Sequence, residues 1–235
     1  MTVLIVTGTG TDVGKTVATA AIAACASGRV AVVKPAQTGV APGEPGDLAE
    51  VTRLSGVTDT FEFARYPDPL SPHHAAQVSG LPDLDYADAV RRIDDLAGEY
   101  DLVLVEGAGG LLVPFDSDKR WTLIDLAADL HCQFVVVTQP GLGTLNHTAL
   151  TVERLDAEAL DLAGLIIGSW PAEPDRAMRC ALPDLRRMGA RRGLGGVLPA
   201  GMPTVRDFRG AARRALAPEF GGTFDSRAFV ARYLR

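Results

Sequence analysis

The chain has 235 residues, 47% of them apolar, and a formal net charge of −6, which suits one α/β domain with a buried core. No apolar run reaches the roughly 18 residues that a membrane span needs. The N-terminus runs from an apolar strand into a glycine loop, unlike a signal peptide. Cys25, Cys132 and Cys180 share no close spacing and are expected to be buried thiols in a reducing cytoplasm. We therefore expect a cytoplasmic protein without membrane contact.

The charge is unevenly distributed along the chain. From Arg176 onward there are 13 Arg and only four acidic residues. A basic tail can bind nucleic acid, but these arginines occur on helix-like stretches without interleaved aromatic residues, and the chain as a whole is acidic. We expect them on solvated helix faces or in ion pairs with the acidic part of the same or a partner subunit, and we expect no nucleic-acid binding.

Short apolar runs rich in β-branched residues predict buried strands of a parallel sheet. In chain order they are Val3–Val6, Val30–Val33, Leu102–Val105, Phe134–Val137, Leu162–Ile167 and Gly196–Leu198. Helical patterns fall between them, at Lys15–Ala26, Asp83–Leu96, Leu123–Leu130, Leu145–Leu160 and Asp175–Met188. Strands that alternate with helices predict a doubly wound, mainly parallel α/β sheet with helices on both faces, in a single domain over residues 1–235.

Residues Thr58 to Pro82 hold many prolines and few periodic positions. This composition predicts a long surface loop, on which His73 and His74 are expected to face solvent. Ligands of doubly wound sheets bind beyond the carboxyl ends of the strands. The residues that follow the predicted strands are therefore the candidates for a functional site.

The stretch Gly8-Thr9-Gly10-Thr11-Asp12-Val13-Gly14-Lys15-Thr16 follows the first strand and opens a helix. Backbone N–H groups of such a loop cradle phosphate, and the helix N-terminus adds partial positive charge. Lys15 is expected to reach the β- and γ-phosphates, and the Thr16 hydroxyl to ligate Mg²⁺. Five residues separate Gly8 from Gly14 where the usual motif has four. The alternative is a glycine turn that contains Gly-Lys-Thr by chance.

Two further candidates follow the second strand. Lys34, in Lys34-Pro35-Ala36-Gln37-Thr38-Gly39, is placed to neutralise charge on the same phosphate; alternatively it is a surface lysine. Asp47, in Gly46-Asp47-Leu48-Ala49, suits either a helix N-cap or a magnesium ligand.

A buried strand ends in a carboxylate and a glycine-rich turn at Val103-Leu104-Val105-Glu106-Gly107-Ala108-Gly109-Gly110. An acid at the end of such a strand can help hold a metal ion. The glycines permit a backbone nest that donates to an anion.

These segments, in this order, together with Leu142-Gly143-Thr144-Leu145-Asn146-His147-Thr148, resemble the dethiobiotin synthetase family over essentially the whole chain. The resemblance implies a P-loop NTPase-like fold. It also implies that 7,8-diaminononanoate reacts with CO₂ and ATP to give dethiobiotin, ADP and phosphate, with Mg²⁺ as cofactor.

The resemblance further implies roles for individual residues. The expected catalytic residues are Lys34, Lys15 and Thr11, and the expected Mg²⁺ ligands are Thr16, Asp47 and Glu106. The expected nucleotide contacts are Asp12, Val13, Gly14, Lys15, Thr16, Val17, Asp47, Glu106, Gly107, Ala108, Gly109, Gly168, Ser169, Pro199, Ala200 and Gly201. The expected substrate contacts are Thr38, Gly110, Thr144, Leu145 and Asn146.

In the family, the element that corresponds to Gly143–Thr148 comes from the partner subunit and binds the substrate carboxylate, so a homodimer is expected. A helix N-terminus suits a carboxylate, although an ordinary helix start explains the same residues.

The chain departs from the family pattern at Gly168, in Ile167-Gly168-Ser169-Trp170, where many members place an Asn that reads adenine. Without that amide, we expect a relaxed nucleotide preference, with CTP or GTP supporting turnover within about tenfold of ATP.

Two rival functions carry phosphate-binding loops of this kind. Partitioning or positioning ATPases, which act through a protein partner, usually have a second lysine early in the loop, where this chain has Thr9-Gly10. Amidotransferase ligases need a glutaminase module, for which the chain has no room.

Overall fold

The structure is a computed structural model that describes residues 2–189 and 193–233. Its strands form one seven-stranded sheet in the order β3-β2-β4-β1-β5-β6-β7, and each neighbouring pair is parallel. They are β1 (Thr2–Gly8), β2 (Val30–Thr38), β3 (Thr60–Tyr66), β4 (Leu102–Glu106), β5 (Gln133–Thr138), β6 (Leu162–Trp170) and β7 (Leu194–Pro199). The predicted parallel sheet is confirmed.

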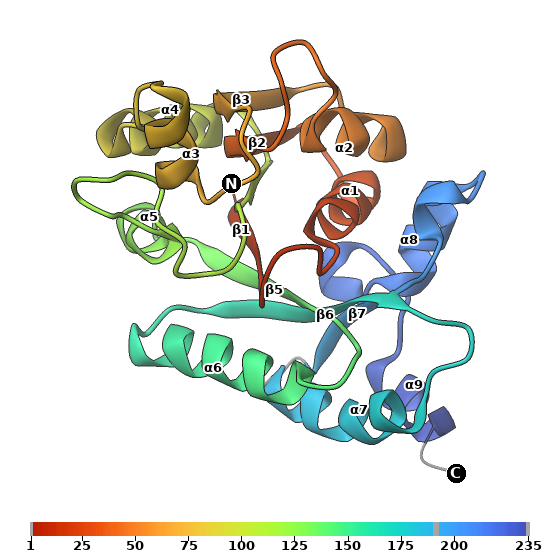
Figure 1. Cartoon of the computed structure of the whole chain (residues 1–235). Helices are drawn as coiled ribbons and strands as arrows, with labels where there is room; N and C mark the ends of the chain where they lie inside the picture. Colours follow the sequence, from red (N-terminus) through yellow and green to blue (C-terminus); the bar gives the residue numbers. More distant parts are fainter. Residues whose placement is uncertain (1, 190–192, 234–235) are drawn as a thin grey trace.

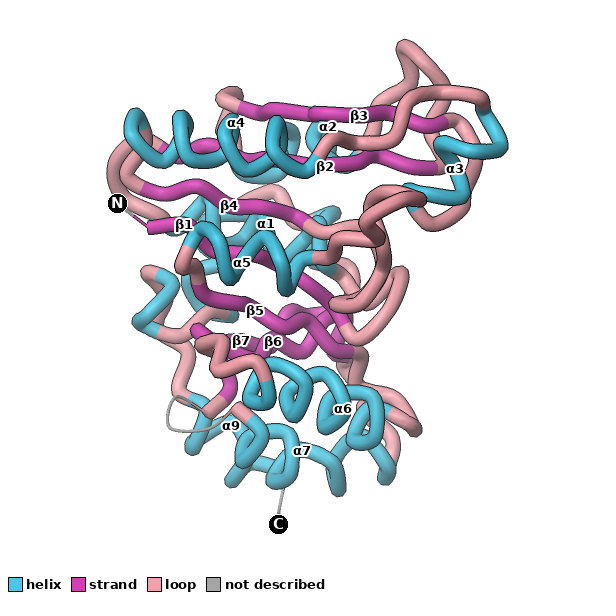
Figure 2. The backbone as a smooth tube through the Cα atoms, turned by 90° about the vertical axis from the view of Figure 1, so that its left-hand side faces the viewer, coloured by secondary structure: helices cyan, strands magenta, loops and turns pink. Residues whose placement is uncertain are grey.

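Helices cover both faces of the sheet (Figures 1 and 2). They are α1 (Lys15–Cys25), α2 (Asp47–Ser55), α3 (Pro72–Ser79), α4 (Tyr86–Glu99), α5 (Leu123–Leu130), α6 (Thr144–Ala157), α7 (Arg176–Met188), α8 (Phe208–Ala215) and α9 (Ser226–Tyr233). Helix α1 packs against α2 and α8, whereas α4 packs against α5 and α6 against α7. The connections after the neighbouring strands β1 and β4 thus leave toward opposite faces, which creates the crevice typical of a topological switch point.

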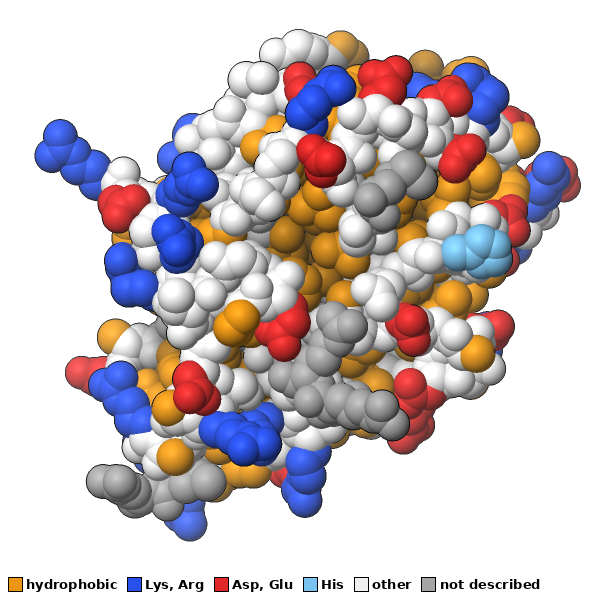
Figure 3. Space-filling model, turned by 180° about the vertical axis from the view of Figure 1, so that it is seen from behind, with side chains coloured by type: hydrophobic (Ala, Val, Ile, Leu, Met, Phe, Trp, Pro, Cys, Tyr) orange, Lys and Arg blue, Asp and Glu red, His pale blue; other side chains and the backbone are white. Residues whose placement is uncertain are grey.

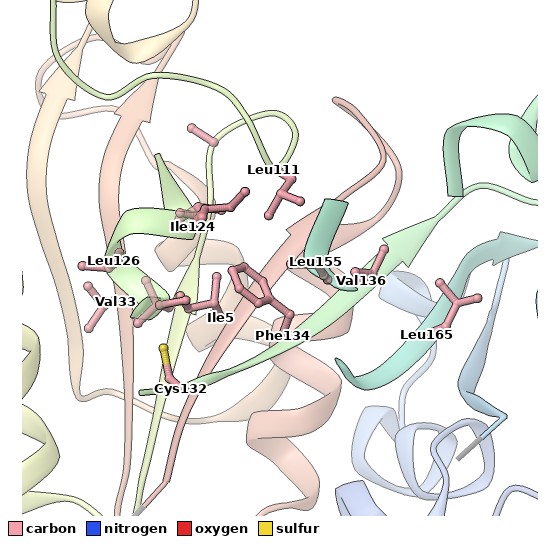
Figure 4. Packing of buried hydrophobic residues seen from close by; sticks show 14 of the residues in the cluster. Ile5, Val33, Leu111, Ile124, Leu126, Cys132, Phe134, Val136, Leu155 and Leu165 are labelled. Atoms are coloured by element: carbon pink, nitrogen blue, oxygen red, sulfur yellow. The ribbon is translucent and has the colours of Figure 1, made fainter. Parts of the chain in front are cut away.

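Two clusters of buried apolar side chains hold the helices to the sheet. One contains Ile5, Val105 and Phe134 and extends to α4, α5 and α7; the other contains Leu4 and Val6 and extends to α1, α2 and α8. Figure 4 shows Phe134 of β5 beside Ile5 of β1. Both faces of the central strands are therefore covered, which explains their continuous apolar sequences.

The predicted helices are confirmed, with shifts at their ends. Helix α4 begins at Tyr86 instead of Asp83, because the side chain of Asp85 accepts a hydrogen bond from the first turn. Thr122 and Asp125 form a capping box at α5, and Asp175 caps α7.

The predicted loop over residues Thr58 to Pro82 is wrong, because it contains β3 and α3. Strand β3 lies at the edge of the sheet and carries the Glu62–Arg65 ion pair, so its polar side chains interrupt the apolar pattern. Helix α3 has Ser71 at its N-cap and Pro72 at its first position, which is a helix-start signature among the prolines of this stretch.

Two expectations about exposure are also corrected. His73 is only 5% exposed, with Nδ1 3.2 Å from the carbonyl oxygen of Pro114, whereas His74 is exposed as predicted. Cys132 is buried and Cys25 half-buried, but Cys180 is exposed; all three are free thiols.

Basic and acidic side chains are interspersed on the surface seen from behind in Figure 3. On α7, Arg187 pairs with Asp184 one turn away, as expected for a solvated helix face. Within residues 2–189 and 193–233, no helix has the length and apolarity needed to cross a membrane.

Candidate functional site

A cleft of about 870 Å³ opens at the carboxyl ends of β1, β2 and β4. Most of the residues predicted for the site line it: Thr11, Asp12, Gly14, Lys15, Thr16, Val17, Lys34, Thr38, Asp47, Glu106, Ala108 and Gly109. Segments from three strand ends, far apart in sequence, therefore meet in one place, as the sheet topology requires.

The phosphate-binding loop (residues 8–16) connects β1 to α1. Asp12 and Gly14 have left-handed backbones, with φ of 58° and 99°, and the Thr9 N–H donates to the Val137 carbonyl oxygen of β5 at 2.9 Å. The first helical bond of α1 runs from Ala18 N–H to Gly14 O, and Gly14 supplies no side-chain cap. The N–H groups of the first turn thus lack helical partners, which makes this end of α1 suited to an anion.

Lys15 is the first residue of α1 and is 8% exposed. Its Nζ donates to the carbonyl oxygen of Gly10, 2.9 Å away in the same loop. Burial, together with the nearby charge of Lys34, lowers the pKa of the Lys15 ammonium. Two ammonium groups that repel each other in a cleft favour an anionic ligand between them.

Lys34 lies at the centre of a buried polar cluster. Its Nζ is 2.6 Å from Oδ2 of Asp47 and 2.9 Å from Oε1 of Glu106, and it also donates to the carbonyl oxygen of Gly107 at 3.2 Å. Burial alone would lower the pKa of Lys34, but the charges of Glu106 and Asp47 outweigh burial and raise it. Lys34 is therefore held as a cation between two carboxylates.

Glu106 is the last residue of β4 and is fully buried. Its Oε1 accepts hydrogen bonds from Lys34 and, at 2.9 Å, from the Thr16 hydroxyl, whereas Oε2 has no partner. A buried carboxylate oxygen without a partner, next to a hydroxyl and a second carboxylate, fits an oxygen-ligated cation. The described residues contain no group of three or more His, Cys, Asp or Glu side chains that could hold a metal ion, so phosphate oxygens or water must complete such a site.

Asp47 is the first residue of α2, and Gly46 occupies the N-cap position. The interpretation of Asp47 as an N-cap is therefore wrong. Its carboxylate turns toward Lys34 instead, with 36% of the side chain exposed to the cleft.

The segments predicted to contact the base lie beside the phosphate-binding loop without lining the cleft. A Cβ on Gly168 would stand 2.1 Å from the carbonyl oxygen of Val13, so β6 and the loop touch through backbone atoms. Ser169 has a left-handed backbone with φ of 52°. The Ala200 N–H donates to Trp170 O at 2.7 Å, which places the Pro199–Gly201 turn at the same end of β6.

The N-terminus of α6 lies outside the cleft. Thr144 is buried, with its hydroxyl 2.8 Å from that of Thr138, and Thr9 donates to the same Thr138 hydroxyl at 3.4 Å. Leu145 is half-buried and Asn146 is exposed. Within one chain, these three predicted substrate contacts are not brought to the cleft.

Gly107, Gly110 and Val13 lie next to lining residues and do not line the cleft themselves.

Another part of the cleft wall was not predicted from the sequence. Pro69 to Pro72, Gln37 and Val113 line the cleft there. The Ser71-Pro72 pair was the available signal, since it marks the start of a helix at the end of a strand.

We expect removal of the Lys34 charge to destabilise the nucleotide-free protein. Lys34→Gln leaves Glu106 buried without its cation, and breaking a buried ion pair costs about 3–5 kcal/mol in the free energy of unfolding. Urea denaturation followed by circular dichroism measures the change. Lys119→Gln is the matched control, because Lys119 is exposed and should change stability by less than about 0.5 kcal/mol. Equal effects of the two variants would contradict a structural role for the pair.

The fold is similar to that of a solved nucleotide complex, a Cyanothece McdA variant bound to ATP. That chain is 14% identical to this one, with a TM-score of 0.54 and coverage of 100% of this chain and 96% of that chain. At this identity the likeness concerns the fold alone.

Sequence comparison is more specific. Residues 2–200 match the family model described as an AAA domain. The ATP-dependent dethiobiotin synthetase BioD of Frankia casuarinae is 57% identical over a 238-residue alignment that covers 99% of each chain. The protein of the same name from Rhodococcus jostii is 61% identical over 188 residues, 79% of this chain and 81% of that protein. Identity at this level over nearly the whole length shows that the chain belongs to the ATP-dependent dethiobiotin synthetase family.

Proposed function

We propose that the chain catalyses ATP-dependent ureido ring closure in biotin biosynthesis, converting 7,8-diaminononanoate and CO₂ to dethiobiotin with release of ADP and phosphate. We further propose that it acts in the cytoplasm as a homodimer. The observation that carries the activity is the position of Lys34, Asp47, Glu106 and Thr16, which meet beside the phosphate-binding loop in one cleft. The reaction proposed for this cleft is that of the synthetase family to which the chain belongs.

The proposed reaction has three steps. CO₂ carbamylates one amine of the diamine, the carbamate oxygen attacks the γ-phosphate and releases ADP, and the second amine attacks the resulting mixed anhydride and expels phosphate. Such phosphoryl transfer depends mainly on positioning and on stabilisation of charge. Lys15 and Lys34 supply two cations at the end of the cleft, and Thr11 and Thr38 offer hydroxyls to the carbamate and the diamine.

Thr16, Asp47 and Glu106 would hold Mg²⁺ together with phosphate oxygens. The unpartnered Oε2 of Glu106 and the hydroxyl of Thr16 are hard oxygen ligands of the kind that Mg²⁺ selects. When bound, the ion supplies charge neutralisation on the β- and γ-phosphates. With the ion bound, Lys34 would contact substrate in place of the two carboxylates, because these carboxylates would hold the ion.

A partner-directed ATPase of the partitioning or positioning type is the alternative function, because such proteins carry a phosphate-binding loop of this kind on a similar fold. The fold likeness concerns a shared architecture, and a shared fold does not carry a shared function. The early Thr9-Gly10 of the loop and the high identity to synthetases favour the ligase.

Phosphate release from Mg-ATP and bicarbonate, with and without 7,8-diaminononanoate, tests the proposed activity. We expect release to depend on the diamine and mass spectrometry to detect dethiobiotin. Lys34→Gln should lower kcat at least a hundredfold, because it removes a cation that would stabilise the phosphoryl group, worth about 2.7 kcal/mol or more. Glu106→Gln should lower kcat by a similar factor, because it removes a carboxylate proposed to hold Mg²⁺. Steady hydrolysis that ignores the diamine would favour the alternative ATPase.

We also expect the enzyme to accept several nucleotides. Gly168 offers no side chain to read the base, and its α-carbon packs against Val13 and Gly14. Loss of one polar base contact is worth roughly 1–2 kcal/mol, so CTP and GTP should support turnover within about tenfold of ATP. Initial rates with the four nucleoside triphosphates measure this preference, and activity with ATP alone would refute it.

The proposed dimer places the N-terminus of α6 over the partner's cleft. Asn146 and the 90% exposed Leu142 lie at this end of the helix, where their exposed side chains would be available to the partner subunit.

Mixing two inactive variants tests the shared site. Lys34→Gln disables the cleft, and Asn146→Trp blocks the space in front of α6. After mixing and subunit exchange, we expect recovery of up to about a quarter of wild-type activity, because each mixed dimer keeps one intact site. Size-exclusion chromatography with light scattering should show that both variants remain dimers. No recovery from two dimeric variants would place the whole site within one subunit.

A further inference from the structure

Gln37 is a buried amide whose two polar groups are both engaged. It lies in β2 and is 4% exposed. Its Oε1 accepts a hydrogen bond from the N–H of Asp47 at 2.8 Å, and its Nε2 donates to the carbonyl oxygen of Thr38 at 3.1 Å. The amide thus joins the end of one strand to the start of the next helix.

Helix α2 has no capping side chain of its own, since Gly46 occupies the N-cap. The first N–H of the helix would lack a partner, and Gln37 supplies the acceptor from the neighbouring strand. The fit is close, because a Cβ on Gly46 would stand 2.6 Å from Oε1 of Gln37. Glycine at this position is therefore part of the same contact.

A second contact holds the β2–α2 connection from the other side. Arg65 of β3 donates to the carbonyl oxygens of Ala41 at 3.1 Å and Glu44 at 2.7 Å. Its remaining guanidinium N–H groups pair with Glu62 on its own strand. Side chains of two strands therefore fix the connection that ends at Asp47, Arg65 in its middle and Gln37 at its end.

We infer that Gln37 is a positioning residue for the proposed magnesium site, acting through Asp47. It fixes the backbone of Asp47 so that Oδ2 stands 2.6 Å from Lys34, next to Glu106. The carboxylate is then held in place before a cation arrives, and less ordering of the chain accompanies binding. The inference rests on the proposed function for the metal site itself. Groups that orient metal ligands commonly change metal affinity 10- to 100-fold when they are removed.

Direct binding of Mn²⁺, in the presence of a non-hydrolysable ATP analogue, tests this role by electron paramagnetic resonance. Gln37→Met keeps the length of the side chain and removes both hydrogen bonds. We expect its dissociation constant for Mn²⁺ to rise about tenfold. The KM for Mg²⁺ in turnover should rise similarly, with kcat within about twofold of the wild type. Gln37→Glu keeps the acceptor for the Asp47 N–H but loses the donor to the Thr38 carbonyl oxygen, so it should weaken Mn²⁺ binding less than Gln37→Met does.

Gly46→Ala provides a second route if Gln37→Met proves too unstable. The added methyl group displaces the end of the flexible Gln37 side chain and should weaken Mn²⁺ binding in the same direction. Ser55→Ala is the matched control. The Ser55 hydroxyl donates to Val51 O at 2.7 Å at the far end of the same helix, so its loss loosens α2 away from the cleft and should leave Mn²⁺ affinity unchanged.

Asp47→Asn separates the two possible failures. If this variant binds Mn²⁺ like the wild type, the proposed metal site is wrong and the role of Gln37 fails with it. If Asp47→Asn loses Mn²⁺ while Gln37→Met and Gly46→Ala keep wild-type affinity, the metal site stands and the positioning role is wrong. If Ser55→Ala loses as much Mn²⁺ affinity as Gln37→Met, Gln37 only stabilises α2 in general and the positioning role is wrong.

Discussion

The buried ion pair of Lys34 and Glu106 is the constraint on which the rest of the cleft depends. Both side chains are removed from solvent on adjacent strands, Lys34 within β2 and Glu106 at the end of β4, where isolated charges would be strongly destabilising. The structure compensates with Asp47, with the Thr16 hydroxyl and with the carbonyl oxygen of Gly107. These groups come from α2, from the phosphate-binding loop and from the turn after β4, so satisfying one pair of charges fixes three separate connections.

In the nucleotide-free cleft, each of the two ammonium groups has an acceptor from the protein itself, whereas Oε2 of Glu106 has no partner. Lys34 takes the two carboxylates that suit a metal ion, and Lys15 takes the carbonyl oxygen of Gly10. In the proposed reaction, Asp47 and Glu106 would instead hold the magnesium ion, and Lys15 and Lys34 would contact the nucleotide phosphates. Each of the two carboxylates would then have a cation beside it with and without the nucleotide.

Sequence alone predicted those features that depend on neighbouring residues or on a strong pattern. Strands that are buried on both faces were predicted from their apolar runs. Lys15, Lys34 and Glu106 were predicted from motifs that follow the apolar runs. Edge strand β3 was missed because its half-exposed positions carry charges such as Glu62 and Arg65. The roles of Gln37 and of the Pro69–Pro72 wall depend on tertiary contacts, which link residues through the sheet and leave no local pattern.

The surroundings of a glycine are also hard to predict from the sequence, because the residue type does not show which atoms occupy the place of a side chain. At Gly46 the space belongs to the flexible amide of Gln37, which can shift aside. At Gly168 it belongs to the backbone carbonyl of Val13, within the phosphate-binding loop, which cannot. Restoring a base-reading amide at position 168 therefore requires β6 and the loop to move apart. The residue proposed to influence base recognition and the loop that is proposed to hold phosphate are in steric contact, so we expect a side chain at position 168 to disturb the proposed phosphate site.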